Sequence, residues 1–224
     1  MILASRDSNL VKNRKTTRLC IVRHGETDWN AQKRIQGHID VPLNAVGLSQ
    51  AAAAAAGLAG LAFRAVYSSD LSRAWQTAKA AASVLGAEVM PAVGLRERNY
   101  GIFQGKTAVE MAREHPDIHA RYQARDPHYN FVTGESLESF AARVVGAVEA
   151  LASRHAGESL LLISHGGALD ICYRHATGRP LSTPRDFTIP NAAFNWFEVG
   201  PAGWRLLAWG DRKHLERALE EAVE

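Results

Sequence analysis

The chain has 224 residues, of which 46% are hydrophobic and 22% charged, and its net charge at pH 7 is +3. These values are typical of a globular protein with one sizeable core, and so small a charge argues against a nucleic-acid partner. No apolar run reaches the roughly 18 residues that a membrane-spanning helix needs, so no membrane partner is expected. The sequence shows no secretory signal peptide, and we expect a cytoplasmic protein.

The N-terminal stretch differs from the rest of the chain because it is polar, basic and aperiodic. We expect residues 1–17 to form a disordered tail, with a functional basic arm as the alternative. Residues 18–224 are expected to form one domain. Cys20 and Cys172 lie in separate apolar segments and are expected to be buried thiols, although a disulfide stays open.

The first predicted elements are a strand, a helix and a second strand. The apolar run at 18–22 predicts the first strand, and the run at 64–69 predicts the second. Between them, the alanine-rich segment 44–61 is amphipathic and predicts a helix with Asn44 as its N-cap.

A second helix, a short strand and an interrupted helical segment are predicted next. Asp70 is placed to cap a helix that runs to about Leu85, followed by a short strand at 87–91. Gly86 is a suitable stop for that helix. The segment 107–125 also has helical character, with an interruption at Pro116.

The last part of the chain continues the alternation. A long helix is predicted at 135–157, and the continuous apolar run at 159–164 is typical of a strand buried on both faces. A helix at 167–178 and an antiparallel pair of strands at 192–199 and 204–210 complete the prediction. Strands that alternate with helices favour a mainly parallel sheet covered on both faces.

Polar residues of similar type follow three of the predicted strands. Arg23 and His24 follow the first strand, Arg73 falls in the helical turn after the second, and His165 follows the buried strand. In such sheets the ligand site lies outside the carboxyl ends of the strands. We therefore expect these four side chains to share one cleft.

The chemistry that suits these four side chains is phosphoryl transfer. Guanidinium groups and a helix N-terminus match the charged oxygens of a phosphoryl group, and an imidazole can attack phosphorus to form a covalent intermediate. No P-loop, GxGxxG motif or paired-carboxylate pattern is present. The other histidines lack this context and are expected to be surface or packing residues: His38, His115, His119, His128, His155, His175 and His214.

The motif "RHGETDWN" resembles the signature of the histidine phosphatase superfamily, in its phosphoglycerate mutase-like branch. Further motifs follow in the family's order: "RIQGHIDVPLNAVGLSQA", "VYSSDLSRAWQTA", "LRERNYGIFQGKT", "TGESLESFAARV", "LLISHGG" and "PNAAFNWFEV". The resemblance implies a three-layer α/β/α sandwich. It further implies that His24 is the phosphorylated nucleophile and that Arg23, Arg73 and His165 hold the phosphoryl oxygens.

The resemblance also assigns a proton donor and a set of binding residues. Glu97 would be the general acid that protonates the leaving oxygen and then the base that activates water; the alternative is a surface ion pair with Arg96 or Arg98. No metal ion or cofactor is implied. The implied phosphate- and substrate-binding residues are Asn30, Gln36, Gly37, Tyr100 and Gly166.

The family contains phosphatases and mutases, and the sequence favours a metal-independent phosphatase. The span from Lys106 to Thr133 is short and lacks the Arg-Arg pair of the cofactor-dependent mutases, and Gly167 replaces their usual Asn. Against this, "ERNYGIFQG" and Tyr100 match the mutase wording, so a phosphoglycerate mutase is the first alternative. A catalytically inactive phospho-ligand-binding module is the second alternative, and a metal hydrolase is the third.

The substrate is expected to be a small phosphorylated metabolite, such as a sugar phosphate, a phosphoglycerate or a nucleotide-like phosphate of the α-ribazole phosphate kind. A lid is expected at 120–134, where Arg125, His128 and Tyr129 either contact the leaving group or lie on a solvated hairpin. A homodimer, in which the partner is a second copy of the chain, stays open.

Overall fold

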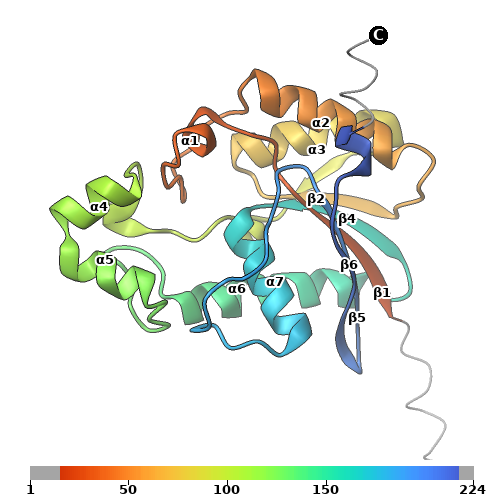
Figure 1. The fold of residues 1–224 in the computed structure, drawn as a ribbon. Coiled ribbons are helices and arrows are strands. Elements are labelled where there is room, and N and C mark those ends of the chain that lie inside the picture. The colour runs from red at the N-terminus through yellow and green to blue at the C-terminus, as the bar shows by residue number, and fades with distance from the viewer. Residues whose placement is uncertain (1–15, 217–224) are drawn as a thin grey trace, which may run out of the picture.

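A six-stranded mixed sheet forms the centre of the computed structural model, which describes residues 16–216 (Figure 1). The strand order is β3-β2-β4-β1-β5-β6; β1 to β4 are parallel to one another, and β5 and β6 run antiparallel. The expected mainly parallel sheet is therefore confirmed. The strands are β1 (Thr17–Arg23), β2 (Ala65–Ser68), β3 (Val89–Pro91), β4 (Ser159–Ser164), β5 (Phe194–Gly200) and β6 (Gly203–Asp211).

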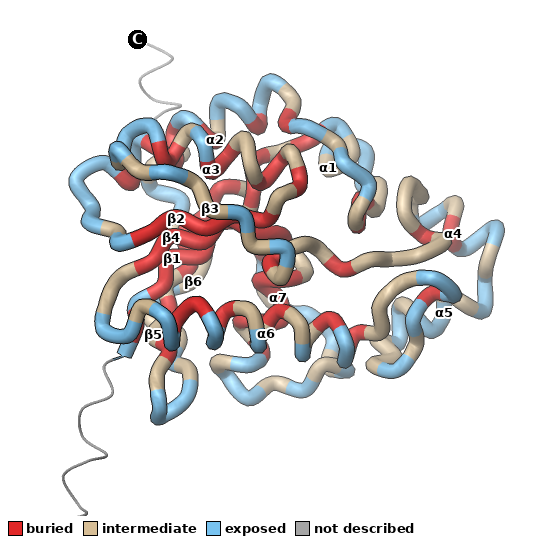
Figure 2. Tube along the Cα trace, turned by 180° about the vertical axis from the view of Figure 1, so that it is seen from behind, coloured by how far each residue is buried: buried red, intermediate tan, exposed pale blue. Residues whose placement is uncertain are grey.

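Helices cover both faces of the sheet, which gives the three layers that the family resemblance implied. Helices α2 and α3 lie on one face, and α6 and α7 lie on the other (Figures 1 and 2). The helices are α1 (Asp28–Ala31), α2 (Ala45–Leu58), α3 (Ser72–Leu85), α4 (Ala108–Glu114), α5 (Pro116–Gln123), α6 (Leu137–Arg154) and α7 (Gly166–Thr177).

The alternation of side chains along β1 explains why the strand reads as a continuous apolar run. Leu19 and Ile21 pack with α6 and α7, whereas Cys20 and Val22 pack with α2 and α3. Successive side chains of a strand point to opposite faces, so a strand between two helical layers must be apolar at every position. The buried red positions of Figure 2 accordingly gather on the central strands.

The start of β1 lies one residue earlier than predicted. Thr17 is the first residue of the strand and is buried, and its hydroxyl donates to the carbonyl of Ala152 at 2.7 Å. Of the rest of the predicted tail, Thr16 is described, and residues 1–15 lie outside the described residues. Cys20 and Cys172 are both buried free thiols, as predicted.

Of the two predicted helix N-caps, the one on α2 is present in the structure and the one on α3 is not. Asn44 caps α2 as predicted, because its side chain accepts the Gly47 N–H at 2.8 Å. The prediction that Asp70 caps α3 is wrong. Asp40, which is distant in sequence, accepts the Ser72 N–H at 2.7 Å, while Arg96 binds the Asp70 carboxylate at 2.5 Å.

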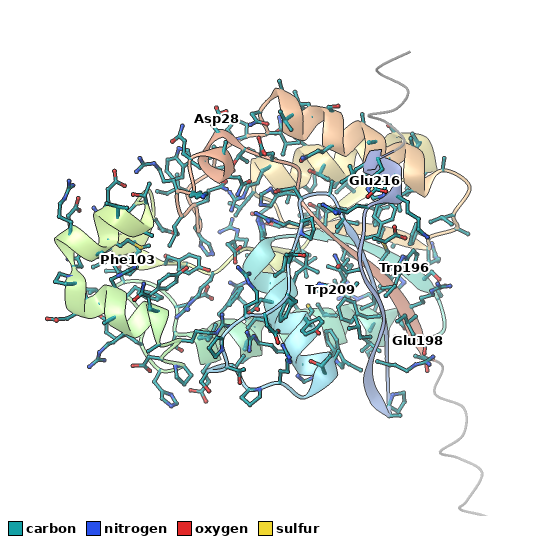
Figure 3. The ribbon with its side chains drawn as sticks, in the orientation of Figure 1. Asp28, Phe103, Trp196, Glu198, Trp209 and Glu216 are labelled. Carbon is teal, nitrogen blue, oxygen red and sulfur yellow. The ribbon has the colours of Figure 1, made fainter. Side chains whose placement is uncertain are left out.

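The predicted interruption at Pro116 is confirmed and divides the segment into α4 and α5. These two helices project to one side of the sheet (left in Figure 1). They have a small apolar cluster of their own, built around Phe103, Met111 and Phe131, and Phe103 lies at its centre (Figure 3). We call the projection from Asn99 to Glu135 the α4–α5 excursion. Within residues 16–216, no helix is long and apolar enough to cross a membrane.

Candidate active site

The carboxyl ends of β1, β4 and β2 bring the predicted residues together. The His24 N–H donates to the Ser164 carbonyl at 3.0 Å, and the Ser69 N–H donates to the Ile163 carbonyl at 3.0 Å. These bonds continue the parallel ladders past the ends of the strands. As a result, the rings of His24 and His165 lie with their centroids 5.1 Å apart.

His24 is buried, and one of its ring nitrogens is already engaged. Its Nδ1 lies 2.6 Å from the Gly25 carbonyl oxygen, an acceptor, so Nδ1 carries the hydrogen and Nε2 keeps a lone pair. Burial lowers the pKa of His24 well below its usual value, and the charges of Arg73 and Arg23 lower it further. The imidazole is therefore neutral at physiological pH, as a nucleophile must be.

His165 is fully buried and is also held through one ring nitrogen. Its Nε2 lies 2.8 Å from the Ser69 hydroxyl, whereas its Nδ1 has no hydrogen-bond partner among the described residues. Burial lowers its pKa well below the usual value, and the charge of Arg73 lowers it further. A buried polar atom without a partner is costly, and such atoms mark places where a ligand can bind.

Arg23 and Arg73 are fixed by backbone carbonyls rather than by acidic side chains. Arg23 donates to the Ile189 carbonyl at 2.6 Å, and Arg73 donates to the carbonyls of Gly37 and Ile39 at 2.8 and 3.1 Å. Burial lowers the pKa of each guanidinium to about 10, so both stay charged at neutral pH. The Nε atoms of both arginines are buried without a partner. The two side chains therefore offer positive charge that no carboxylate neutralises by direct contact.

Glu97 lies in the same cavity as His24 and accepts two backbone N–H groups. Oε1 accepts from Arg98 at 2.8 Å, and Oε2 accepts from Gly167, in the first turn of α7, at 2.8 Å. The carboxylate is therefore aimed across the N-terminus of the helix that follows His165. It forms no ion pair with either neighbouring arginine, so the alternative reading of Glu97 as half of a surface pair is wrong.

The backbone of Glu97 is anchored from two directions. Its carbonyl accepts from His38 Nε2 at 2.8 Å and from the Arg143 guanidinium at 3.0 Å. Because Arg143 belongs to α6, this second bond ties the Glu97 loop to that helix, and Arg143 also binds the Glu135 carboxylate at 2.7 Å. His38, which was expected to be a surface or packing residue, therefore contacts the segment that carries Glu97.

A small cavity of about 150 Å³ lies over His24. Asn30 lines it, although its Oδ1 accepts from the Thr27 N–H at 3.1 Å and so also caps α1. Gln36 is buried there, and its Oε1 has no partner among the described residues. The residues that line this cavity include eight of those named from the sequence: Arg23, His24, Asn30, Gln36, Gly37, Arg73, Glu97 and Tyr100.

A larger cavity of about 440 Å³ shares Arg23, Glu97 and Tyr100 with the small one. Gly166 lines this larger cavity, which lies between α7 and the α4–α5 excursion. Of the three residues suggested for the lid, only Arg125 lines it. His128 is exposed and bonds to Glu138 at 3.0 Å instead.

Sequence reasoning missed several residues that support the site. Ser69 holds His165, and the Asn191 side chain donates to the His24 carbonyl at 2.8 Å. Asn191 lies in "PNAAF", a motif singled out without a role for this residue. Tyr122 and Arg185 line the larger cavity, but no local pattern in the sequence distinguishes them from solvated side chains.

Among residues 16–216, no group of three or more His, Cys, Asp and Glu side chains is placed to hold a metal ion. The positive charge at the site comes from Arg23, Arg73 and the N-terminus of α7. Together with a neutral imidazole and a carboxyl group that can carry a proton, these groups can bind a phosphoryl dianion, attack it and protonate its leaving group.

Comparisons with known proteins agree with this arrangement. The sequence model of the histidine phosphatase superfamily (branch 1) matches residues 19–212, and the chain belongs to this family. It is an enzyme of the phosphoglycerate mutase-like kind.

Two relatives from Arabidopsis thaliana and one solved structure illustrate the likeness. A metal-independent phosphoserine phosphatase is 37% identical over 205 residues, which cover 90% of this chain and 84% of that protein. Phosphoglycerate mutase-like protein 4 is 36% identical over 202 residues, which cover 88% and 86%. The structure of YhfR from Bacillus stearothermophilus has a TM-score of 0.83 and 28% identity, and the match covers 89% of this chain and 99% of that one.

Proposed function

We propose that the protein is a metal-independent phosphomonoesterase that acts through a phosphohistidine intermediate on small phosphorylated metabolites. The observation that carries this proposal is the state of His24. Its Nδ1 is bonded to the Gly25 carbonyl, so that a neutral ring presents Nε2 to the cavity that the guanidinium groups of Arg23 and Arg73 also line. A nucleophile beside an anion cradle is the arrangement that phosphoryl transfer to an imidazole requires.

In the first step, the Nε2 lone pair of His24 forms a bond to phosphorus while the bond from phosphorus to the leaving oxygen breaks. Arg23, Arg73 and His165 bind the phosphoryl oxygens. We assign the Ser69 hydroxyl hydrogen to His165 Nε2, because that hydroxyl already accepts from the Leu71 N–H at 3.4 Å. The proton of His165 is then on Nδ1, which donates to a phosphoryl oxygen.

Glu97 handles the protons of both steps. As the first bond breaks, its carboxyl group gives a proton to the leaving oxygen, which departs as an alcohol. In the second step, the carboxylate takes a proton from water while the water oxygen attacks phosphorus. The bond between phosphorus and His24 then breaks, which releases inorganic phosphate and restores the neutral imidazole.

Hydrolysis is favoured over mutase activity by what the α4–α5 excursion contributes to the larger cavity. Of the arginines between Lys106 and Thr133, only Arg125 lines this cavity; Arg113 and Arg121 pair with acidic residues at the surface. The excursion therefore supplies no pair of guanidinium groups to retain and reorient a substrate. The relative described as a phosphoserine phosphatase supports the same choice.

The test is a screen of purified protein against a panel of phosphomonoesters, with and without excess chelator, alongside an assay of 2- and 3-phosphoglycerate interconversion. We expect phosphate release from several esters that chelator does not reduce. Interconversion much faster than phosphate release would replace the proposal by the mutase alternative. Loss of activity in chelator would favour a metal hydrolase, and no turnover would favour a binding module.

The covalent step has its own test. His24→Ala should abolish turnover and also abolish an acid-labile, alkali-stable phosphoprotein trapped by rapid quench. The control is His175→Ala, because His175 is exposed and pairs with Glu149 at 3.7 Å, away from the site. His24→Ala with turnover within about tenfold of wild type would refute the phosphohistidine intermediate.

A further inference from the structure

The larger cavity is the part of the site that the phosphoryl group of a bound substrate would leave unoccupied. It adjoins the small cavity over His24, because Arg23, Glu97 and Tyr100 line both. A substrate whose phosphoryl group reaches His24 must therefore place its leaving group in the larger cavity. The chemistry of this lining decides which leaving groups fit.

The lining carries an excess of positive charge. Four arginines contribute to it, namely Arg23, Arg98, Arg125 and Arg185. The acidic residues of the lining are Glu97 and Asp170. The four positive and two negative side chains leave a net charge of +2, so the cavity favours an anionic leaving group over a neutral or cationic one.

Three of the four guanidinium groups already have protein partners. Arg23 binds the Ile189 carbonyl and faces the phosphoryl site. Arg98 donates to the carbonyls of Glu135 and Tyr129 at 3.0 and 3.1 Å. Arg125 donates to Asp170 at 2.6 Å, an ion pair that also joins the excursion to α7.

The two carboxylates of the lining are also engaged. Glu97 accepts the two backbone N–H groups described above. Asp170 is buried, and its Oδ2 accepts from both Arg125 and Arg174, at 2.6 and 3.0 Å. Neither acidic side chain therefore bonds to Arg185.

Arg185 differs from the other arginines of the cavity. Its guanidinium forms no hydrogen bond or ion pair with any residue within 16–216, and the side chain is exposed at the mouth of the cavity. It lies in the loop between α7 and β5, the loop that also supplies Ile189. Its charge reaches the site, because after burial it is one of the causes that lower the pKa of Arg23.

We propose that Arg185 binds a carboxylate group on the leaving group of the substrate and so determines substrate specificity. This inference rests on the proposed phosphatase function. Arg23 serves the phosphoryl group, and Arg98 and Arg125 bond to protein atoms. Arg185 is therefore the guanidinium of this lining that has no partner among residues 16–216 and can bind an anionic group of the substrate. A guanidinium binds a carboxylate through two parallel hydrogen bonds, and Tyr100 and Tyr122 line the same cavity.

The test compares substrates that differ only by the carboxylate: O-phosphoserine with O-phosphoethanolamine, and 2-phosphoglycolate with methyl phosphate. The wild type should prefer the carboxylate-bearing member of each pair. Arg185→Gln should lower kcat/KM for that member by about tenfold, mainly through KM, and should change the other member less than about twofold. Arg185→Lys should retain part of the preference, because it keeps the charge but loses the two-bond geometry.

The matched control is Arg179→Gln, because Arg179 begins the same loop but is paired with Asp186 at the surface. This variant should keep the wild-type preference. The assignment of Arg185 is overturned if the wild type does not prefer the carboxylate-bearing esters, or if Arg185→Gln affects both members of a pair equally. Those outcomes leave the phosphatase proposal intact, whereas a wild type that hydrolyses no phosphomonoester refutes the proposed function itself.

Discussion

The Nδ1 atom of His24 lies 2.6 Å from the carbonyl oxygen of Gly25, and this contact decides which ring nitrogen can react. A carbonyl oxygen only accepts, so the tautomer is fixed by a residue next in the chain. The backbone of Gly25 comes this close to the His24 ring while it also packs against Gly47 of α2, which requires a residue without a side chain. A Cβ at Gly25 would lie 2.4 Å from the Gly47 carbonyl oxygen. The glycine of "RHGE" thus positions the nucleophile rather than only breaking the strand.

The two buried histidines predict how stability depends on pH. The pKa values of His24 and His165 are held well below the usual value by burial and by the nearby arginines. Below about pH 6.5, the unfolded chain therefore binds protons that the folded chain does not. Unfolding free energy should fall on acidification, by up to about 1.4 kcal/mol per pH unit for each histidine.

Urea unfolding at pH 7.5, 6.5 and 5.5, in buffer without phosphate or sulfate, measures this dependence. His24→Asn should lower the slope of unfolding free energy against pH between 6.5 and 5.5 relative to wild type, because one of the two histidine contributions is gone. An unchanged slope, or an NMR titration that places the His24 pKa near 6.5 in the folded protein, would contradict the prediction.

The proposed role of Glu97 predicts a dependence on the leaving group. Glu97→Gln should slow the hydrolysis of alkyl phosphates by about a hundredfold or more, because their alkoxides need a proton in the transition state. The same variant should slow the hydrolysis of p-nitrophenyl phosphate much less, since the p-nitrophenolate ion leaves without a proton. The measurement is single-turnover kinetics with both substrates. Equal slowing of the two would mean that Glu97 is structural or acts only when water attacks.

Most of the fold could be predicted from the sequence because each element carries its own local pattern. The run from Leu160 to Ile163 has no polar residue, and a strand with helices on both faces requires that. The cap of α3 could not be predicted, because Asp40 reaches it from a distant loop while Arg96 binds the nearby Asp70. Such pairings depend on tertiary structure rather than on spacing.

The residues of the site likewise fall into those that could be predicted from the sequence and those that could not. His24 and His165 could be placed together because each follows a strand, and the carboxyl ends of parallel strands share one edge of a sheet. Glu97 needed the family resemblance, since its position follows from loops rather than from the end of a strand. His38 and Arg185 could not be predicted, because a histidine or an arginine in a polar loop is usually solvated, and only the folded chain shows what lies beside it.

The contact between His38 and the Glu97 carbonyl predicts a positioning role. His38→Ala removes one of the two donors that anchor this carbonyl, so the carboxyl group should lose its alignment with the leaving oxygen. We expect kcat for alkyl phosphates to fall severalfold, with little change in KM and little change for p-nitrophenyl phosphate. His38→Gln, which keeps a donor, should recover part of the loss. The control is His119→Ala in α5, and an equal loss with both substrates would exclude a role through Glu97.

Gly167 provides the last prediction, because its lack of a side chain makes room for Glu97. A Cβ at this position would lie 2.1 Å from Glu97 Oε1, so Gly167→Ala must displace the carboxylate while the backbone of α7 stays helical. Turnover of alkyl phosphates should fall by at least about tenfold, and turnover of p-nitrophenyl phosphate should fall less.

Gly146→Ala in α6 is the matched control, because a Cβ there meets nothing within 4 Å. This control should keep full activity and gain about 0.5–1 kcal/mol of stability from the better helix propensity of alanine. The measurements are the activity of both variants with both substrates and their thermal unfolding. A Gly167→Ala enzyme that hydrolyses alkyl phosphates at the wild-type rate would show that the position of the Glu97 carboxylate does not limit catalysis.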